Sequence, residues 1–181
     1  EDRGVLDFED VLVLTAGILQ DYPAIAQRIH RQYRSFVVDE YQDVSALQHH
    51  VLNLWLGGRH DICVVGDVAQ TIYSFAGASP RYLQDFAQEH KGARVVQLVR
   101  DYRSTPQIVS AANTLMKGEH SSVLKGAVKL VSQRDNGVPV DYQSYADDND
   151  EAVGIARQIR KLHDDGVSYS SIAILYRTNG Q

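Results

Sequence analysis

The hydrophobic positions of the first half of the chain follow two periods, which predict helices and strands in alternation. Residues 7 to 20 carry apolar side chains on one helical stripe, with Asp7 placed to cap its first turn. The apolar runs at residues 35 to 39 and 61 to 67 are continuous, as in strands that are buried on both faces. A helical pattern at residues 45 to 56 separates them. This order favours an α/β fold with a parallel sheet covered by helices.

The remainder of the chain continues the alternation, with a polar, glycine-punctuated connection at residues 117 to 136 that holds one short strand. Pro23, Pro80 and Pro106 each stand near the start of a helical pattern. We expect further helices from Pro23 onward and at residues 80 to 90, 105 to 116 and 147 to 166, and further strands at residues 93 to 98, 139 to 146 and 171 to 177.

Composition narrows the class of protein only slightly. The 181 residues are 44% hydrophobic and carry a net charge of −5, which is ordinary for a globular protein and argues weakly against one that coats nucleic acid. A single cysteine, Cys63, rules out an internal disulfide and fits a reducing compartment. No apolar run is long enough to span a bilayer. We therefore expect a cytoplasmic protein with no membrane partner.

Three carboxylates follow the first strand, in the stretch FVVDEYQD. An apolar strand that ends in Asp39 and Glu40 offers one carboxylate for Mg²⁺ and another to orient or deprotonate a water molecule. In parallel sheets, ligands bind at this carboxyl end of the strands. Acidic residues in this position also often cap the next helix, and Asp43 or Ser45 suits that role. On this motif alone, both interpretations stay open.

The second strand is followed by a similar arrangement, in VVGDVAQTIYSFAGA. Gly66, Asp67 and Gln70 lie where a phosphate group would bind, and a neutral amide donor such as Gln70 is suited to sense a terminal phosphate. Tyr73 and Phe75 follow closely. They are either core residues or an exposed platform on which bases stack.

A third stretch, LVRDYRST, places Tyr102 beside Arg103 just before a predicted helix. An aromatic ring and a guanidinium suit the base and the phosphate of a nucleotide, although a plain surface pair has the same sequence. The histidines show no metal-binding spacing, and we expect His49 and His50 on an ordinary helix surface.

Together and in this order, the three stretches resemble the UvrD/PcrA/Rep family of superfamily 1 DNA helicases. VVDEYQD resembles the Walker B segment, GDVAQTIYSFAGA the motif GDxxQSIYxFRGA, and LVRDYRST the motif that ends in NYRS. DFEDVL and AILYRTNGQ resemble two further family segments. The resemblance implies RecA-like parallel sheets with flanking helices, in parts of two motor domains.

The resemblance also implies ATP and Mg²⁺ as cofactors, and it gives each matching residue a role. Asp39 would hold Mg²⁺, Glu40 would activate the attacking water, and Gln70 would sense the terminal phosphate. Tyr102 would stack on adenine, and Arg103 would reach the γ-phosphate from the second motor domain. The residues expected at single-stranded or partly duplex DNA are Tyr73, Phe75, Arg177 and Asn179.

The sequence departs from the family pattern at three positions. Ala76 replaces the arginine of FRGA, which removes one candidate contact and puts the grip on DNA in doubt. Asp101 replaces the asparagine of NYRS, and Thr71 replaces the serine of QSIY.

No GxxxxGK[ST] phosphate loop occurs in the chain, which begins at Glu1 and not at Met. We expect a piece of a larger helicase or translocase that moves 3′ to 5′. Residues 1–100 would be the latter part of the first motor domain, and residues 101–181 the first part of the second. The piece alone would hydrolyse little ATP and would need the remaining helicase domains.

Two alternatives stay open. One is a helicase-like module without catalysis that binds single-stranded DNA or a protein. The other is a metal-dependent nuclease that uses Asp39, Glu40 and Asp43, which leaves Gln70 and the Tyr102–Arg103 pair without a role. The sequence does not choose between DNA repair, replication restart and plasmid copying as the pathway served.

Overall fold

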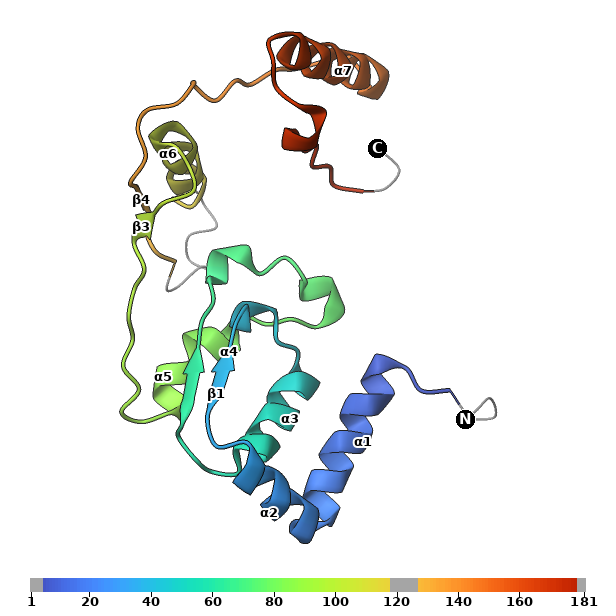
Figure 1. Ribbon diagram of the computed structural model, residues 1–181, viewed down its shortest axis with the longest axis vertical. Helices are drawn as coiled ribbons and strands as arrows, with labels where there is room; N and C mark the ends of the chain where they lie inside the picture. Colours follow the sequence, from blue (N-terminus) through green and yellow to red (C-terminus); the bar gives the residue numbers. More distant parts are fainter. Residues whose placement is uncertain (1–4, 118–126, 179–181) are drawn as a thin grey trace. The chain divides into compact units, whose positions relative to one another are not determined.

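The chain begins with two helices, α1 and α2, which are labelled in Figure 1. The computed structural model describes residues 5–117 and 127–178. Helix α1 (Phe8–Asp21) begins after Asp7, whose carboxylate accepts a hydrogen bond from the Asp10 N–H at 2.8 Å. Pro23 opens helix α2 (Pro23–Gln32). The predicted N-cap at Asp7 and the predicted first helical residue Pro23 are both confirmed.

Helix α3 (Ala46–Leu56) is capped at both ends by residues that the sequence singles out. Ser45 and Gln48 exchange reciprocal hydrogen bonds at its start, a capping box. Gly57 ends the helix with a φ of +60°, the left-handed conformation that glycine adopts without steric cost. The helix therefore starts and stops where its neighbours in the sequence dictate, and it packs against α1 and α2.

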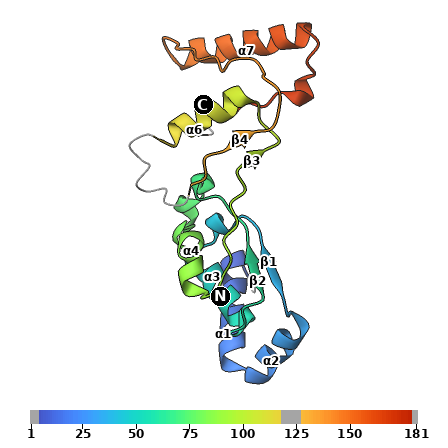
Figure 2. The same cartoon turned by 90° about the vertical axis from the view of Figure 1, so that its left-hand side faces the viewer.

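Strands β1 (Phe36–Val38) and β2 (Ile62–Val64) pair in parallel, as predicted, and lie side by side in Figure 2. The ladder continues beyond both strands: the Val65 N–H donates to the Val38 carbonyl at 2.8 Å, and the Tyr41 N–H donates to the Val65 carbonyl at 2.9 Å. These bonds hold the segment after β1 against the segment after β2, which brings the two predicted phosphate-handling stretches to one edge.

The prediction that both strands are buried on both faces is wrong for the residues described. Val37 and Cys63 are register partners at the strand centres, yet Val37 is 78% exposed and Cys63 is also exposed. A two-stranded sheet presents two faces, and the described helices leave this one open.

The chain forms two compact units, with the division between Val138 and Pro139. The rest of the first unit consists of short elements. They are the 3₁₀ turns η1 (Tyr41–Asp43), η2 (Val68–Gln70) and η3 (Ser74–Ala76), the helices α4 (Arg81–Gln84), α5 (Phe86–Glu89) and α6 (Pro106–Leu115), and the parallel strands β3 (Arg100–Asp101) and β4 (Val131–Ser132). The single helix expected at residues 80 to 90 is thus two short helices that meet at Asp85.

The second unit contains helix α7 (Asp148–Asp164) and the 3₁₀ turn η5 (Tyr169–Ser171). Asp147 caps α7 by accepting a hydrogen bond from the Asp150 N–H at 2.8 Å, and the acidic first turn complements the positive helix start, as predicted. The division at residue 138 concerns compactness, so the border between motor domains near residue 100 stays a prediction. Within the described ranges, no helix is long and apolar enough to cross a membrane.

Three expected strands are absent from the described residues: residues 93 to 98, 139 to 146 and 171 to 177. Their apolar side chains are solvent-exposed, for example Val95 at 71%, Leu98 at 73% and Leu175 at 92%. A strand needs a neighbour to satisfy its backbone hydrogen bonds, and these runs find none in the described structure. The predictions failed because they used only the apolar composition of each segment. Whether a strand forms also depends on a partner strand elsewhere in the chain.

Arg59 ties the ends of α2 and α3 to the start of β2. Its guanidinium donates hydrogen bonds to the carbonyls of His30 and Tyr33, at 2.8 and 2.7 Å, and to those of Trp55 and Leu56, at 2.9 and 2.7 Å. These carbonyls lie at or near the carboxyl ends of the two helices, where no intrahelical donors remain for the last turn. One side chain therefore holds the carboxyl ends of α2 and α3 together, just before β2 begins.

Replacing Arg59 with alanine is expected to lower the free energy of unfolding by about 1.5–3 kcal/mol, because several carbonyls lose a charged donor. Urea denaturation followed by the fluorescence of Trp55, the one tryptophan in the sequence, measures the change. Arg28→Ala, at an exposed position of α2, is the matched control and should change stability by less than about 0.5 kcal/mol. Equal stability of both variants would contradict the capping role.

Candidate nucleotide site

Asp39 and Glu40 stand directly after β1, in a turn with an unusual backbone. Glu40 has φ +51° and ψ +40°, and it is the one non-glycine residue with positive φ in the described part of the chain. The Glu40 N–H donates to Asp39 Oδ1 at 3.0 Å, which fixes the two residues relative to each other. Both are exposed. The left-handed turn thus presents two adjacent carboxylates to solvent at the strand end.

Gln42 connects these carboxylates to the end of the neighbouring strand. Its amide nitrogen donates to Glu40 Oε2 at 2.6 Å, and its amide oxygen accepts from the Asp67 N–H at 2.9 Å. Gln42 is only 1% exposed. A Cβ on Gly66 would lie 2.6 Å from the Gln42 side-chain oxygen, so only glycine leaves room for this bridge. One buried amide therefore orients Glu40 and joins the two loops.

Sequence reasoning did not select Gln42. The signal available was a neutral amide within an otherwise acidic run, DEYQD. Its role depends on Gly66 and Asp67, which lie more than twenty residues further along the chain.

A cleft of about 520 Å³ opens beside this bridge. Gln70 stands at the cleft, and its amide nitrogen donates to Asp67 Oδ2 at 3.0 Å, while Asp67 Oδ1 accepts from the Ala69 N–H at 2.9 Å. The residues that line the cleft are Glu40, Gln42, Asp43, Ala69, Gln70, Ile72 and Tyr73. The structure thus brings three residues predicted from the sequence, Glu40, Gln70 and Tyr73, to one concave surface.

Carboxylate oxygens at the turn beside the cleft are the kind of ligand that a hard divalent cation prefers. Asp43 Oδ1 is buried without a hydrogen-bond partner, and Asp39 presents its carboxylate at the same turn. Mg²⁺ typically takes one or two protein carboxylates and completes its shell with water and substrate phosphates. Among the described residues, no group of three or more potential ligands converges, so the nuclease interpretation gains no support from this geometry.

Tyr73 and Phe75 are exposed, by 49% and 85% respectively, so neither is a core residue in the described structure. Their ring centroids lie 5.9 Å apart at an interplanar angle of 51°. Ala76, in place of the family arginine, is exposed on the same turn. Two large aromatic faces thus stand open to solvent next to the cleft.

Tyr102 and Arg103 follow β3 in a turn organised by Asp101. Asp101 Oδ1 accepts hydrogen bonds from the Arg103 and Ser104 N–H groups at 2.7 and 2.8 Å. The Ser104 and Arg103 hydrogen bonds hold the pKa of the Asp101 carboxyl below its usual value of 3.8. Tyr102 is 70% exposed, and the Arg103 carbonyl accepts from Arg134 at 3.0 Å. A cleft shared by Arg103 and Glu40 stays a prediction.

Two departures from the family pattern have a simple structural account. An asparagine oxygen would accept the same two backbone hydrogen bonds as Asp101, so the exchange preserves the turn. The Thr71 hydroxyl donates to the Val68 carbonyl at 3.1 Å, a bond that serine also makes. Arg177 is exposed in the second unit, and Asn179 lies outside the described residues.

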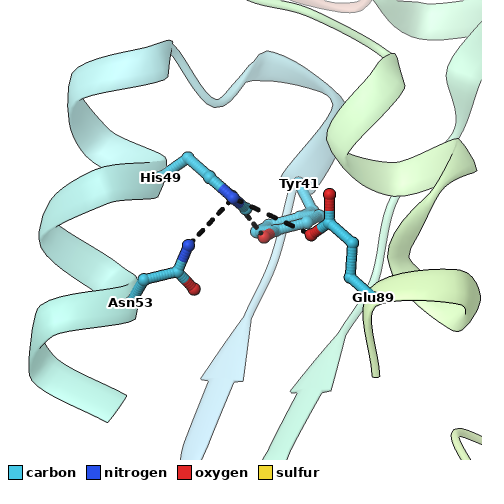
Figure 3. Close-up of polar contacts among 4 residues, drawn as sticks. All are labelled: Tyr41, His49, Asn53 and Glu89. Carbon is cyan, nitrogen blue, oxygen red and sulfur yellow. Dashed lines mark hydrogen bonds and ion pairs between the residues drawn. The ribbon is translucent and has the colours of Figure 1, made fainter. Parts of the chain in front are cut away.

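The expectation for His49 is wrong, whereas His50 is indeed exposed. The His49 side chain is only 14% exposed and contacts Tyr41, the residue next to Glu40, as Figure 3 shows. Helical periodicity identifies the faces of α3, but it does not tell which neighbouring element covers each face.

Comparison with known proteins identifies the family of the chain. The model of the UvrD/REP helicase N-terminal domain matches residues 1–91, and that of the UvrD-like helicase C-terminal domain matches residues 96–181. These matches define the class as UvrD-like helicases. The chain belongs to the UvrD/REP helicase family.

The proteins most similar to the chain include three helicases of this family. The ATP-dependent DNA helicase UvrD2 of Mycobacterium tuberculosis is 47% identical over 177 residues, which is 98% of this chain and 25% of the relative. The ATP-dependent DNA helicases PcrA of Leuconostoc citreum and Staphylococcus aureus are 34% and 33% identical over 97% of the chain, and 23% and 24% of their own lengths are covered. The chain therefore spans about a quarter of the length of these relatives.

Replacing Gln42 with leucine is expected to lower the free energy of unfolding by about 1–3 kcal/mol, because the Asp67 N–H and the Glu40 carboxylate lose a buried partner. Hydrogen exchange of the Asp67 amide should accelerate as well. Urea denaturation and exchange measured by NMR test both effects. Gln27→Leu, on the exposed face of α2, serves as the control. Unchanged exchange at Asp67 would contradict the bridge.

Proposed function

We propose that this chain forms part of an ATP-dependent DNA helicase or translocase. The observation that carries the proposal is the orientation of Glu40 by Gln42 beside Gln70, at one cleft, in a chain of the UvrD/REP family. A carboxylate held by a buried amide acts as a fixed proton acceptor, and a nearby amide is suited to sense a phosphate.

In this proposal, residues at the cleft and Asp39 beside it each carry out one part of ATP hydrolysis. Asp39 holds Mg²⁺, which neutralises charge on the phosphates when bound. Glu40 orients the attacking water and accepts its proton. Gln70 exchanges its bond to Asp67 for one to the terminal phosphate, which links the nucleotide state to the following turn.

The second motor domain completes the nucleotide site in the full-length protein. Tyr102 presents an exposed ring to the adenine, and Arg103 reaches the γ-phosphate when the two motor domains close. Domain closure and reopening convert phosphate chemistry into movement along a strand, by family analogy in the 3′ to 5′ direction.

DNA is the proposed substrate, single-stranded or partly duplex. Tyr73 and Phe75 stack on bases, and Arg177 and Asn179 approach the backbone. The exposed rings support this role, because stacking needs an accessible π-face and tolerates any base sequence.

The 181 residues alone are proposed to turn over little ATP, because their sequence holds no phosphate loop and thus no nest of N–H groups for the phosphates. The remaining helicase domains supply it. The alternative, a binding module without catalysis, predicts that the full-length protein also lacks a GxxxxGK[ST] loop.

Replacing Glu40 with glutamine in the full-length protein should lower kcat for ATP by about 10²- to 10⁴-fold, because the water loses its proton acceptor. The affinity for ATP should change little, since the glutamine keeps the size of the side chain. DNA-stimulated ATPase assays and nucleotide-binding measurements test this pair of effects, with Glu9→Gln at an exposed position of α1 as control. Normal turnover would remove Glu40 from the mechanism.

Replacing Phe75 with alanine in the full-length protein should weaken binding of single-stranded DNA by about 1–3 kcal/mol, the usual contribution of one stacked base. Fluorescence anisotropy with a labelled oligonucleotide measures the change. Phe8→Ala is the matched control, since Phe8 is also a highly exposed phenylalanine, at 92% against 85% for Phe75. Equal affinities of the two variants would exclude stacking on Phe75.

A further inference from the structure

The segment that follows strand β4 runs beside the turn that carries Tyr102 and Arg103. Asp101 and Ser132 are register partners in the parallel pair of β3 and β4. The Gln133 N–H donates to the Asp101 carbonyl at 2.7 Å, which extends the pairing beyond the end of β4. The residues just after β4 therefore lie next to the turn just after β3.

Two side chains of this segment donate hydrogen bonds to carbonyls of the turn. The Arg134 guanidinium donates to the Arg103 carbonyl at 3.0 Å, and the Ser132 hydroxyl donates to the Ser104 carbonyl at 2.7 Å. The Ser132 oxygen also accepts from the Arg134 N–H at 3.1 Å, which holds the two donors together. Neither donor lies in a motif that the sequence singled out, so their arrangement needs its own account.

These bonds restrain the backbone on both sides of Arg103. Asp101 Oδ1 accepts from the N–H groups of Arg103 and Ser104 at 2.7 and 2.8 Å. The Ser104 N–H belongs to the same planar peptide group as the Arg103 carbonyl, which Arg134 binds. Both peptide planes that flank the Arg103 Cα are therefore held by side chains, and with them the direction in which the Arg103 side chain leaves the backbone.

Asp101 cannot do this alone. An ionised carboxylate only accepts hydrogen bonds, so the carbonyls of the turn need donors from another segment. Arg134 and Ser132 supply those donors from β4 and the residues after it. A turn that is held before ligand arrives does not lose conformational freedom when an arginine on it binds a phosphate, and this is the energetic advantage of preorganisation.

We propose that Arg134, supported by Ser132, is a positioning residue for Arg103: it fixes the turn in the orientation from which the Arg103 guanidinium reaches the γ-phosphate. The inference rests on the proposed function of Arg103 and adds two residues to the same site. The peptide group between Tyr102 and Arg103 is bound by Asp101 and not by Arg134, so stacking of adenine on Tyr102 survives the loss of Arg134. The effect therefore falls on steps that involve the γ-phosphate.

The test uses the full-length protein with Arg134→Met, which keeps a long side chain and removes its donors. With saturating DNA, kcat for ATP is expected to fall by about 3- to 10-fold because Arg103 is less well oriented. The affinity for ADP, which has no γ-phosphate, should change little. Arg134→Lys keeps a donor for the carbonyl and should recover most of kcat. Lys129→Met removes an equal charge at an exposed position before β4 and should leave kcat and ADP affinity unchanged.

A double variant separates positioning from a general loss of structure. In an Arg103→Ala background, Arg134→Met should lower kcat no further, because both changes remove the same interaction. An equal fold-loss in both backgrounds would overturn the inference, as would wild-type kcat in both Arg134→Met and Ser132→Ala. Wild-type kcat in Arg103→Ala itself would instead overturn the proposed role of Arg103, and the inference with it.

Discussion

The candidate site depends on one buried amide, that of Gln42. A side chain with a donor and an acceptor can satisfy two strand ends at once, and here it bonds the Glu40 carboxylate on one side and the Asp67 N–H on the other. Gly66 leaves the space that this requires. Because burying an unpaired amide is costly, the bridge forms completely or the turn rearranges. The bridge therefore joins the loops after β1 and β2. Gln70 is positioned by the same network, because its amide donates to Asp67.

Around this bridge, two fully buried large side chains stand next to two exposed carboxylates. Tyr41 and Gln42 are the largest fully buried side chains among the described residues, and they directly follow Asp39 and Glu40. Because Tyr41 and Gln42 are packed in the core, the backbone next to them is constrained. This constraint also limits the positions of the Asp39 and Glu40 carboxylates. Tyr41 and Gln42 thus form a buried base for the two exposed carboxylates.

Much of this arrangement follows from local signals. Asp7, Pro23 and the Ser45–Gly57 pair set helix bounds through their own backbone chemistry, and strand ends followed by acidic or amide residues marked Glu40 and Gln70. The features that could not be predicted from the sequence depend on contacts with residues far along the chain. The burial of His49 depends on α4 and α5, and the bridge by Gln42 depends on Gly66. The apolar runs at residues 93 to 98 and 171 to 177 need strand neighbours that the described residues do not supply.

The left-handed turn at Glu40 bears on which residues this position tolerates. A side chain with a Cβ pays roughly 1–2 kcal/mol in that conformation, whereas glycine adopts it freely. Selection for stability alone would thus favour glycine at this point, and a glutamate there opposes the preference of its own backbone. If Glu40 has the proposed catalytic role, stability and catalysis place opposite demands on the backbone of this one residue.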